Sequence, residues 1–197
     1  RNRATALQQL SEYGRAAEAF SDLYDRFRTG EYAVQDLLSA GTNAQAANDP
    51  TSTEQALRKI LTNHPSSPLL MEAAYNLGLV LRDQDRKSEA LAQFETIAKS
   101  EREPDALLEI GRISLTLDNL SKAERTFDAL RKRFPRNRSA QESYLVMGAW
   151  FEQQAQWAEA TTTYEKARQA KLGAEHQQRI ILGLARVYAE TGKDALQ

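Results

Sequence analysis

The chain has 197 residues, of which 41% are hydrophobic and 27% charged, and its formal net charge is −1. This balance argues against a globally basic nucleic-acid binder, and no apolar run reaches the roughly 18 residues that a membrane-spanning helix needs. The absence of cysteine excludes disulfides, thiolate metal sites and cysteine nucleophiles. Only 9 Gly and 5 Pro occur, and the predominance of Ala, Leu, Gln, Glu and Arg predicts an all-α protein.

An apolar residue followed by a small one recurs at a nearly constant interval. The second residues of successive pairs are separated by 37, 33, 37 and 37 positions. The pairs are Ala40-Gly41, Leu77-Gly78, Ile110-Gly111, Met147-Gly148 and Leu184-Ala185. Such a period is typical of stacked helical units. We predict units at about 1–33 (degenerate), 34–70, 71–103, 104–140, 141–177 and 178–197 (partial).

The first two units conform least well. In the first, Gly14 to Ala19 resembles a turn between two helices, and we expect Leu23 to fill the slot that an aromatic residue occupies elsewhere. In the second, Leu57 occupies that slot, and Thr53 stands where later units have a small alanine. We therefore expect weaker copies of the same helix pair in residues 1–70.

The third unit, 71–103, shows the pattern most clearly. Its first helix places Ala74, Leu77, Gly78 and Leu81 on one face, and its second helix does the same with Ala90, Phe94 and Ile97. Because Gly78 and Ala90 are small, we expect the two antiparallel helices to approach closely. We expect the aromatic residue to fill the space towards the next unit.

The remaining units repeat this pattern with few changes. Ala123 and Phe127 follow Gly111, and Ala160 and Tyr164 follow Gly148, at the same intervals. The last unit supplies Ile181, Leu184, Ala185 and Tyr188 and stops where a second helix would begin. We expect its apolar face to be uncapped and to permit association. Because the sequence begins at Arg1 rather than Met, we also expect a mature or excised fragment.

These residues resemble the signature of the tetratricopeptide repeat (TPR), a 34-residue helix-turn-helix with Leu-Gly in its first helix and Ala and Phe in its second. The resemblance implies a right-handed α-solenoid, a TPR-like superhelix of antiparallel helix pairs, with a concave groove lined by the first helices. It places these residues in a partner-binding groove: Leu38, Glu72, Tyr75, Leu79, Arg82, Asp105, Leu108, Arg112, Glu142, Leu145, Arg179, Leu182 and Arg186.

The resemblance implies a non-catalytic scaffold that binds a peptide or protein segment in this groove. The alternative is a structural element that self-assembles through its terminal repeats. A further alternative is that the apolar groove line, at Leu38, Tyr75, Leu108, Leu145 and Leu182, is only packing between repeats. An RNA-binding repeat is disfavoured by the acidic residues Glu72, Asp105 and Glu142, so we expect no nucleic-acid partner.

No P-loop, dinucleotide fingerprint or nucleophile elbow occurs, so we expect neither enzymatic activity nor a cofactor. His64 and His176 have no metal-ligand spacing, and we expect both at the surface and no metal site. The densest cationic cluster lies at the end of a predicted helix, where the helix dipole favours it; binding of an acidic partner or of phospholipid head groups is the alternative. Its residues are Arg131, Lys132, Arg133, Arg136 and Arg138.

Two repeat junctions, residues 63–68 and 133–140, resemble those of bacterial outer-membrane assembly lipoproteins and of coordinator proteins of the Tol-Pal system. This weaker resemblance implies a periplasmic or cell-envelope location and a role in envelope assembly. A cytoplasmic location is the alternative.

Overall fold

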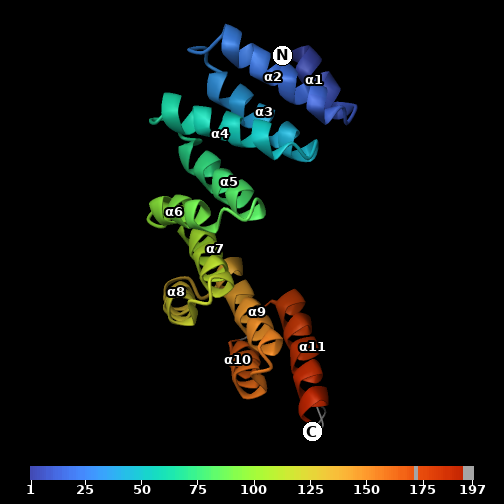
Figure 1. Cartoon of the computed structure of the whole chain (residues 1–197), viewed down its shortest axis with the longest axis vertical. Helices are drawn as coiled ribbons and strands as arrows, with labels where there is room; N and C mark the ends of the chain where they lie inside the picture. Colours follow the sequence, from blue (N-terminus) through green and yellow to red (C-terminus); the bar gives the residue numbers. More distant parts are fainter. Residues whose placement is uncertain (171–172, 193–197) are drawn as a thin grey trace. The chain divides into compact units, whose positions relative to one another are not determined.

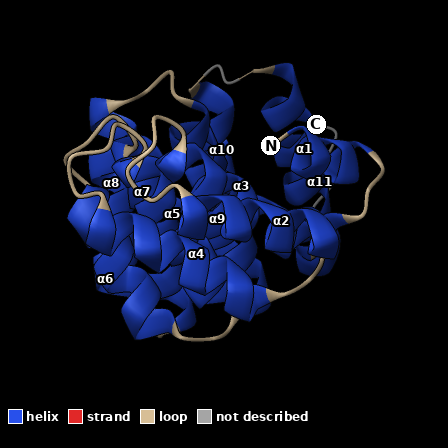
Figure 2. Cartoon of the chain, turned by 90° about the horizontal axis from the view of Figure 1, so that it is seen from above, coloured by secondary structure: helices blue, strands red, loops and turns tan. Residues whose placement is uncertain are grey.

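The computed structural model describes residues 1–170 and 173–192. Within these residues it contains eleven helices and no strand (Figure 2), which confirms the all-α prediction. The end of the last expected repeat, residues 193–197, lies outside the described residues. The chain divides into two compact units, residues 1–102 and 103–197.

The first unit is built from three consecutive helix pairs (Figure 1). Its helices are α1 (Asn2–Gln9), α2 (Tyr13–Arg26), α3 (Ala33–Ala46), α4 (Pro50–Asn63), α5 (Leu70–Asp83) and α6 (Lys87–Ile97). Pro50 occupies the first turn of α4, where its missing N–H costs no hydrogen bond, and the Asp49 side chain caps the same helix by accepting from the Ser52 N–H. Both features give α4 a well-defined start.

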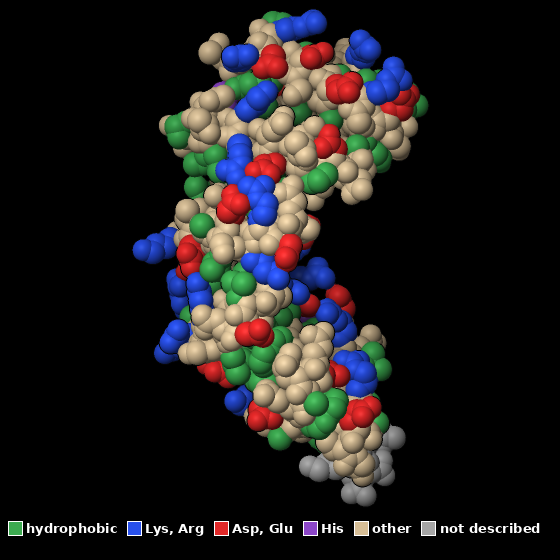
Figure 3. Space-filling view, viewed as in Figure 1, with side chains coloured by type: hydrophobic (Ala, Val, Ile, Leu, Met, Phe, Trp, Pro, Cys, Tyr) green, Lys and Arg blue, Asp and Glu red, His purple; other side chains and the backbone are tan. Residues whose placement is uncertain are grey.

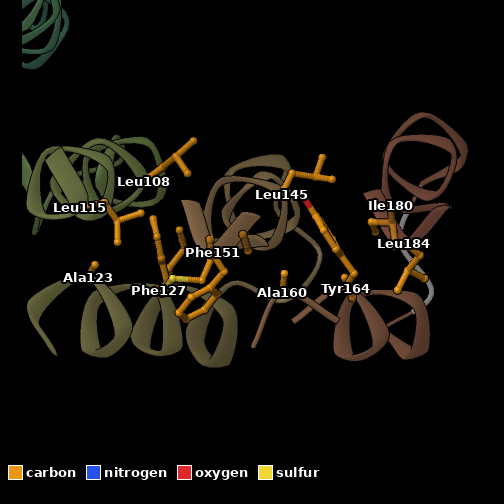
Figure 4. Packing of buried hydrophobic residues seen from close by; sticks show 14 of the residues in the cluster. Leu108, Leu115, Ala123, Phe127, Leu145, Phe151, Ala160, Tyr164, Ile180 and Leu184 are labelled. Atoms are coloured by element: carbon orange, nitrogen blue, oxygen red, sulfur yellow. The ribbon is translucent and has the colours of Figure 1, made fainter. Parts of the chain in front are cut away.

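The second unit has two helix pairs and a further first helix. Its helices are α7 (Glu103–Thr116), α8 (Leu120–Arg133), α9 (Arg138–Gln153), α10 (Trp157–Gln169) and α11 (Ala174–Thr191). The first helices pack in sequence, α9 against both α7 and α11, while α10 packs against α9 and α11. Its core gathers Phe127, Phe151, Tyr164 and Leu184 from four helices (Figure 4).

The turn inside each helix pair has the same backbone conformation. A residue with positive φ follows the first helix, and the next N–H donates to the carbonyl five residues back, as in Gln156 to Phe151. This is the pattern of a Schellman motif, which satisfies carbonyls that the helix end leaves unpaired. The positive-φ residues are Ser11, Asn48, Asp85, Asp118 and Ala155. The residue types at these positions share no pattern that would predict this turn.

The repeated glycine accommodates the aromatic residue of its own helix pair. A Cβ at Gly78 would lie 2.7 Å from Cζ of Phe94, and one at Gly148 would lie 2.4 Å from Cε1 of Tyr164. The Phe94 ring thus packs over Gly78 of its own helix pair. The Tyr164 ring lies close to Gly148 of its own pair and also to Gly183 of the next first helix, as expected of a ring that fills the space towards the next unit. The glycine is needed because the ring leaves no room for a side chain.

The first and last repeats each require a correction. In α2, Gly14 to Ala19 are helical, so the expected turn there is wrong. Phe20 and Tyr24 are both buried, and Phe20 lies four residues after buried Ala16, whereas Leu23, the expected occupant of the aromatic slot, is only half-buried.

In α11 we expected an uncapped apolar face at Ile181, Leu184, Ala185 and Tyr188; Ile181 and Ala185 are exposed, but Leu184 is buried. The packed face lies one position earlier, at Ile180, Gly183, Leu184 and Val187, and His176 is also buried. The ring of Tyr164 leaves no room for a side chain at Gly183, because an added Cβ there would lie 2.6 Å from Cζ of Tyr164.

Candidate functional site

The candidate site of the second unit lies across its first helices. Glu142 and Glu152 of α9 accept hydrogen bonds from Arg179 and Arg186 of α11, and Arg112 of α7 reaches Glu142 from the other side. We call these five residues the arginine–glutamate cluster. It ties three first helices together on one face, which is where the predicted groove residues of this unit lie.

Glu142 is the centre of the cluster. Its Oε2 and Oε1 lie 2.7 Å and 3.1 Å from Nη1 and Nη2 of Arg179, and Oε1 lies 3.3 Å from Nη2 of Arg112. Burial by itself raises the pKa of Glu142, but the hydrogen bonds and charges of the two arginines outweigh burial and leave this pKa below its usual range. Glu142 is thus ionised at neutral pH and holds both neighbouring helices.

Glu152 links the cluster to the core. Its Oε2 lies 2.9 Å from Nε of Arg186 and its Oε1 lies 2.9 Å from Nη2, and Oε1 also accepts a hydrogen bond from the hydroxyl of Tyr164. Burial and this carboxylate raise the pKa of Tyr164, so the phenol stays protonated. The pKa of Glu152 is raised by burial, but the bonds from Arg186 and Tyr164 lower it below its usual range.

His176 lies beneath the cluster. Only 5% of it is exposed, so the prediction that it lies at the surface is wrong. Its Nε2 has no hydrogen-bond partner and lies 3.5 Å from Oε2 of Glu142. The sequence analysis missed it because the one-residue shift of α11 brings position 176 onto the buried face.

Two large apolar side chains are exposed beside the cluster. Ile181 is 59% and Leu182 is 60% exposed, and Leu182 lies on the side of α11 opposite buried Ile180 and Leu184. Leu182 belongs to the predicted groove, and Ile181 belongs to the apolar face of the last repeat that we expected to be uncapped. A partner that covered these two side chains would remove their apolar area from water, and this burial would favour binding.

In the first unit, Tyr75 is the most distinctive of the predicted residues. Its ring packs edge-on against Phe94, with 5.6 Å between centroids, and the Arg102 guanidinium lies 5.2 Å from its centroid. Tyr75 is half-buried, as are Glu72, Leu79 and Arg82. The tyrosine therefore has a fixed orientation and keeps part of its surface accessible.

The predicted groove residues thus differ in exposure. Leu38, Leu108 and Leu145 are buried, which is what the packing alternative requires of them. Asp105, Arg112 and Glu142 are half-buried, and Arg179, Leu182 and Arg186 are exposed. A role of these thirteen residues in binding stays a prediction, and the exposed and half-buried members are the ones a partner can reach in this conformation.

The cationic cluster after α8 is partly used inside the protein. Arg131 stacks over the Tyr144 ring at 3.9 Å and donates to the hydroxyl and carbonyl of Ser143, and burial lowers its pKa. Arg133 pairs with Glu103. These contacts support the interpretation of a structural helix end over that of an open cationic patch. Charges of both signs are interspersed on the surface that Figure 3 shows.

In the described part of the chain, no group of three or more His, Asp or Glu side chains is placed to hold a metal ion. None of the helices described there combines the length and the apolar character that crossing a bilayer requires.

The chain matches a family model for the tetratricopeptide repeat over residues 38–106 and 75–138, which together span more than half of its length. The chain therefore belongs to the tetratricopeptide repeat family, and its fold is the α-solenoid type of that family. Proteins of this family form scaffolds that bind protein or peptide partners, and the family is generally non-catalytic. No curated protein matches the chain.

Solved structures show the same fold. A tetratricopeptide repeat protein from Parabacteroides merdae ATCC 43184 is 14% identical, with a TM-score of 0.74 over 98% of this chain and 72% of that one. PilW, described as a widely conserved type IV pilus biogenesis factor, is 16% identical, with a TM-score of 0.66 over 97% and 84%. YrrB, described as having an unusual peptide-binding site, is 18% identical, with a TM-score of 0.62 over 90% and 87%. At these identities the likeness concerns the fold alone.

Proposed function

We propose that the protein is a non-catalytic scaffold that holds a peptide or protein segment on the face of its first helices. The observation that carries this proposal is the pair of exposed apolar residues, Ile181 and Leu182, beside the arginine–glutamate cluster. Apolar residues supply most of the binding free energy, and the rigid charged groups around them supply orientation. The first unit offers a separate contact point, the half-buried Tyr75, which is of the aromatic kind enriched at interfaces.

We further propose a role in bacterial cell-envelope assembly, in the periplasm or at the outer membrane. The description of PilW, a protein of the same fold, as a type IV pilus biogenesis factor supports the assembly role, and the resemblance of the repeat junctions to those of envelope proteins supports the location. Fractionation of cells that express the full-length protein tests it directly, and recovery with the cytoplasmic proteins would contradict it.

The binding proposal is tested by affinity capture with the full-length protein and two variants, Tyr75→Ala and Leu182→Asp. Both side chains are accessible, so we expect loss of a captured partner without loss of helical circular dichroism. Phe27→Ala is the control, since Phe27 is an exposed aromatic residue in the loop after α2 and is not one of the predicted groove residues. Capture that neither variant weakens would contradict a binding site on this face.

Self-association is the second candidate function, because Ile181 and Leu182 could also bury themselves against another copy. Sedimentation velocity over a wide concentration range distinguishes self-association from binding of a different protein. A dimer that Leu182→Asp dissociates would support self-assembly, whereas a monomer at all concentrations supports the scaffold proposal.

A further inference from the structure

A cavity lies between two loops of the first unit. Residues between positions 31 and 35, at the end of the α2–α3 loop and the start of α3, form one wall, and residues 63–69, before α5, form the other. Its volume is about 650 Å³, within the range of about 300–1,000 Å³ that ligand pockets have. We call it the loop cavity. Its walls belong to consecutive helix pairs, and none of the predicted groove residues lines it.

Apolar side chains supply most of the lining of the loop cavity. They are Tyr32 and Val34 on one side and Pro65, Pro68 and Leu69 on the other. Tyr32 is 52% exposed, and Val34 and Leu69 are half-buried, so a bound group can contact all three. Removing their remaining surface from water would favour binding.

The wall before α5 is held in place from behind. Asn63 donates a hydrogen bond from Nδ2 to the hydroxyl of buried Tyr24 over 2.9 Å, and the His64 ring packs edge-on against the Tyr24 ring with 5.7 Å between centroids. Pro65 and Pro68 fix the backbone φ angle at two positions of the same loop. The loop cavity is thus formed in advance, which lowers the ordering cost of binding.

The corresponding place between α7 and α9 is bridged by a side-chain hydrogen bond. There the Ser139 hydroxyl donates to Oδ1 of Asp105. Counted back from the repeated glycines, Asp105 corresponds to Gln35 of α3, and Ser139 corresponds to Leu69 at the start of α5. Because a leucine side chain has no hydrogen-bonding atom, α3 and α5 cannot form this bridge. The loop cavity lies at the position that it would occupy.

Three polar side chains of the lining have no hydrogen-bond partner among the described residues. They are Glu31, Gln35 and Ser66, and all three are exposed. A carboxylate accepts hydrogen bonds, whereas an amide and a hydroxyl both donate and accept. An extended peptide has free backbone N–H and C=O groups to pair with them, while a helix has used most of its own internally. These side chains therefore favour an extended segment as the ligand.

Glu31 gives the loop cavity a negative charge that no cation of the described residues neutralises. Arg1, beside the loop, is paired with Asp36, and Arg28, within the loop, is paired with Asp25. A cation of the ligand can therefore pair with Glu31. Such charge complementarity contributes to specificity more than to affinity.

We propose that the loop cavity is a second binding site, which takes an extended peptide segment of another protein with a large apolar side chain next to a lysine or arginine. The apolar side chain enters between Tyr32 and Leu69, the peptide backbone pairs with Gln35 and Ser66, and the cation pairs with Glu31. This site goes beyond the proposed function, because it is separate from the predicted groove on the first helices.

The test screens an array of random heptapeptides with the labelled full chain and with a Leu69→Ser variant. Serine is the residue that α9 has at this repeat position, and Leu69 is the N-cap of α5, where serine is favoured, so the variant should fold. Leu10→Ser is the matched control, since Leu10 is 70% exposed at the end of α1 and lies outside the loop cavity. Peptides of the loop cavity should bind Leu69→Ser about tenfold more weakly and Leu10→Ser unchanged, as measured by fluorescence anisotropy.

The sequences of the peptides that depend on Leu69 test the chemistry of the ligand. They should share an apolar residue next to a lysine or arginine, and Glu31→Gln should weaken their binding about threefold. If no peptide depends on Leu69, or if the dependent peptides are acidic or lack a preference for a basic residue, the proposal is overturned.

Binding on the face of the first helices gives a different result. Peptides bound there should depend on Tyr75 or Leu182, whereas Tyr75→Ala should leave the peptides of the loop cavity unaffected. Either proposal can therefore fail while the other stands. A Ser66→Cys variant of the full-length protein should react with maleimide beyond the unsubstituted protein, because Ser66 is exposed. Resistance of this thiol would mean that the protein itself covers the loop cavity, and it would overturn the proposal.

Discussion

The ring of Phe127 occupies the space that a side chain at Gly111 would need. A Cβ built at Gly111 would lie 2.1 Å from Cε1 of Phe127, which is far inside van der Waals contact, and Phe127 is fully buried. Glycine inside a helix costs about 1 kcal/mol relative to alanine. The packing of the ring against Gly111 therefore offsets the lower helix propensity of glycine. The helix pair needs glycine at this position so that the ring can pack there.

Gly111→Ala should destabilise the protein by about 3 kcal/mol, because the buried ring must move to admit the methyl group. Gly41→Ala is the matched comparison: its nearest neighbours would lie 3.6 Å away, an ordinary contact. That change should stabilise the protein by about 1 kcal/mol through helix propensity. Urea unfolding followed by circular dichroism measures both. Equal effects of the two changes would refute the packing role of Gly111.

Ala155→Asn should stabilise the α9–α10 turn by about 1 kcal/mol. Ala155 has φ of 53°, a left-handed conformation that costs an L-residue about 1–2 kcal/mol and that Asn adopts more readily. Asn48 occupies the same place in the α3–α4 turn, with φ of 58°. Asn48→Ala should therefore have the opposite effect on the unfolding midpoint. A destabilised Ala155→Asn protein would argue against strain in this turn.

Glu142→Gln should reduce stability at pH 7 by about 2 kcal/mol, because it weakens charged hydrogen bonds to Arg179 and Arg112. The pKa of Glu142 is lowered in the folded protein. Its stabilising contribution is therefore present above the unfolded-state pKa of about 4.3 and is lost as pH falls through the lower folded-state value. Urea midpoints of the wild type and the variant should converge below about pH 4. A difference that persists at low pH would contradict this linkage.

Arg131→Lys should destabilise the α8–α9 junction by about 2 kcal/mol even though the charge is kept. A lysine cannot reproduce the stacking on Tyr144 together with the two hydrogen bonds to Ser143. Arg136→Lys should change stability by less than about 0.5 kcal/mol, because Arg136 is exposed in the following loop. Thermal unfolding compares the two. Similar shifts would mean that Arg131 acts only as a surface cation.

Most of the fold could be predicted from the sequence because its signal is periodic and local. The spacing of Gly78, Gly111 and Gly148, each followed by an aromatic residue 16 positions later, identifies three helix pairs without tertiary information. The error in α11 arose because Ala185 looked like the next small residue in the series. Tyr164 decides otherwise, since its ring packs against Gly183. The packing of Tyr164 against α11, rather than the 37-residue interval, therefore decides which face of α11 is buried.

The site could be predicted only in part, because exposure depends on which helices are neighbours. Leu108 and Leu182 look equivalent in the expected groove line, yet one is buried and the other is exposed. The pairing of Glu142 with Arg179 joins positions 37 residues apart, and sequence spacing on one helix cannot reveal it. The turn geometry at Ala155 was also hidden, because alanine gives no sign of a left-handed conformation.

The glycine-to-aromatic contact lies within a single hairpin at Gly78–Phe94, Gly111–Phe127 and Gly148–Tyr164. A gene duplication that copies one such hairpin thus copies both halves of its principal contact at once. The new hairpin needs to adapt only where it meets its neighbours, so an array of this kind can lengthen by recombination without a redesigned interior. Its partner specificity can then diverge on the exposed faces while the internal packing stays the same.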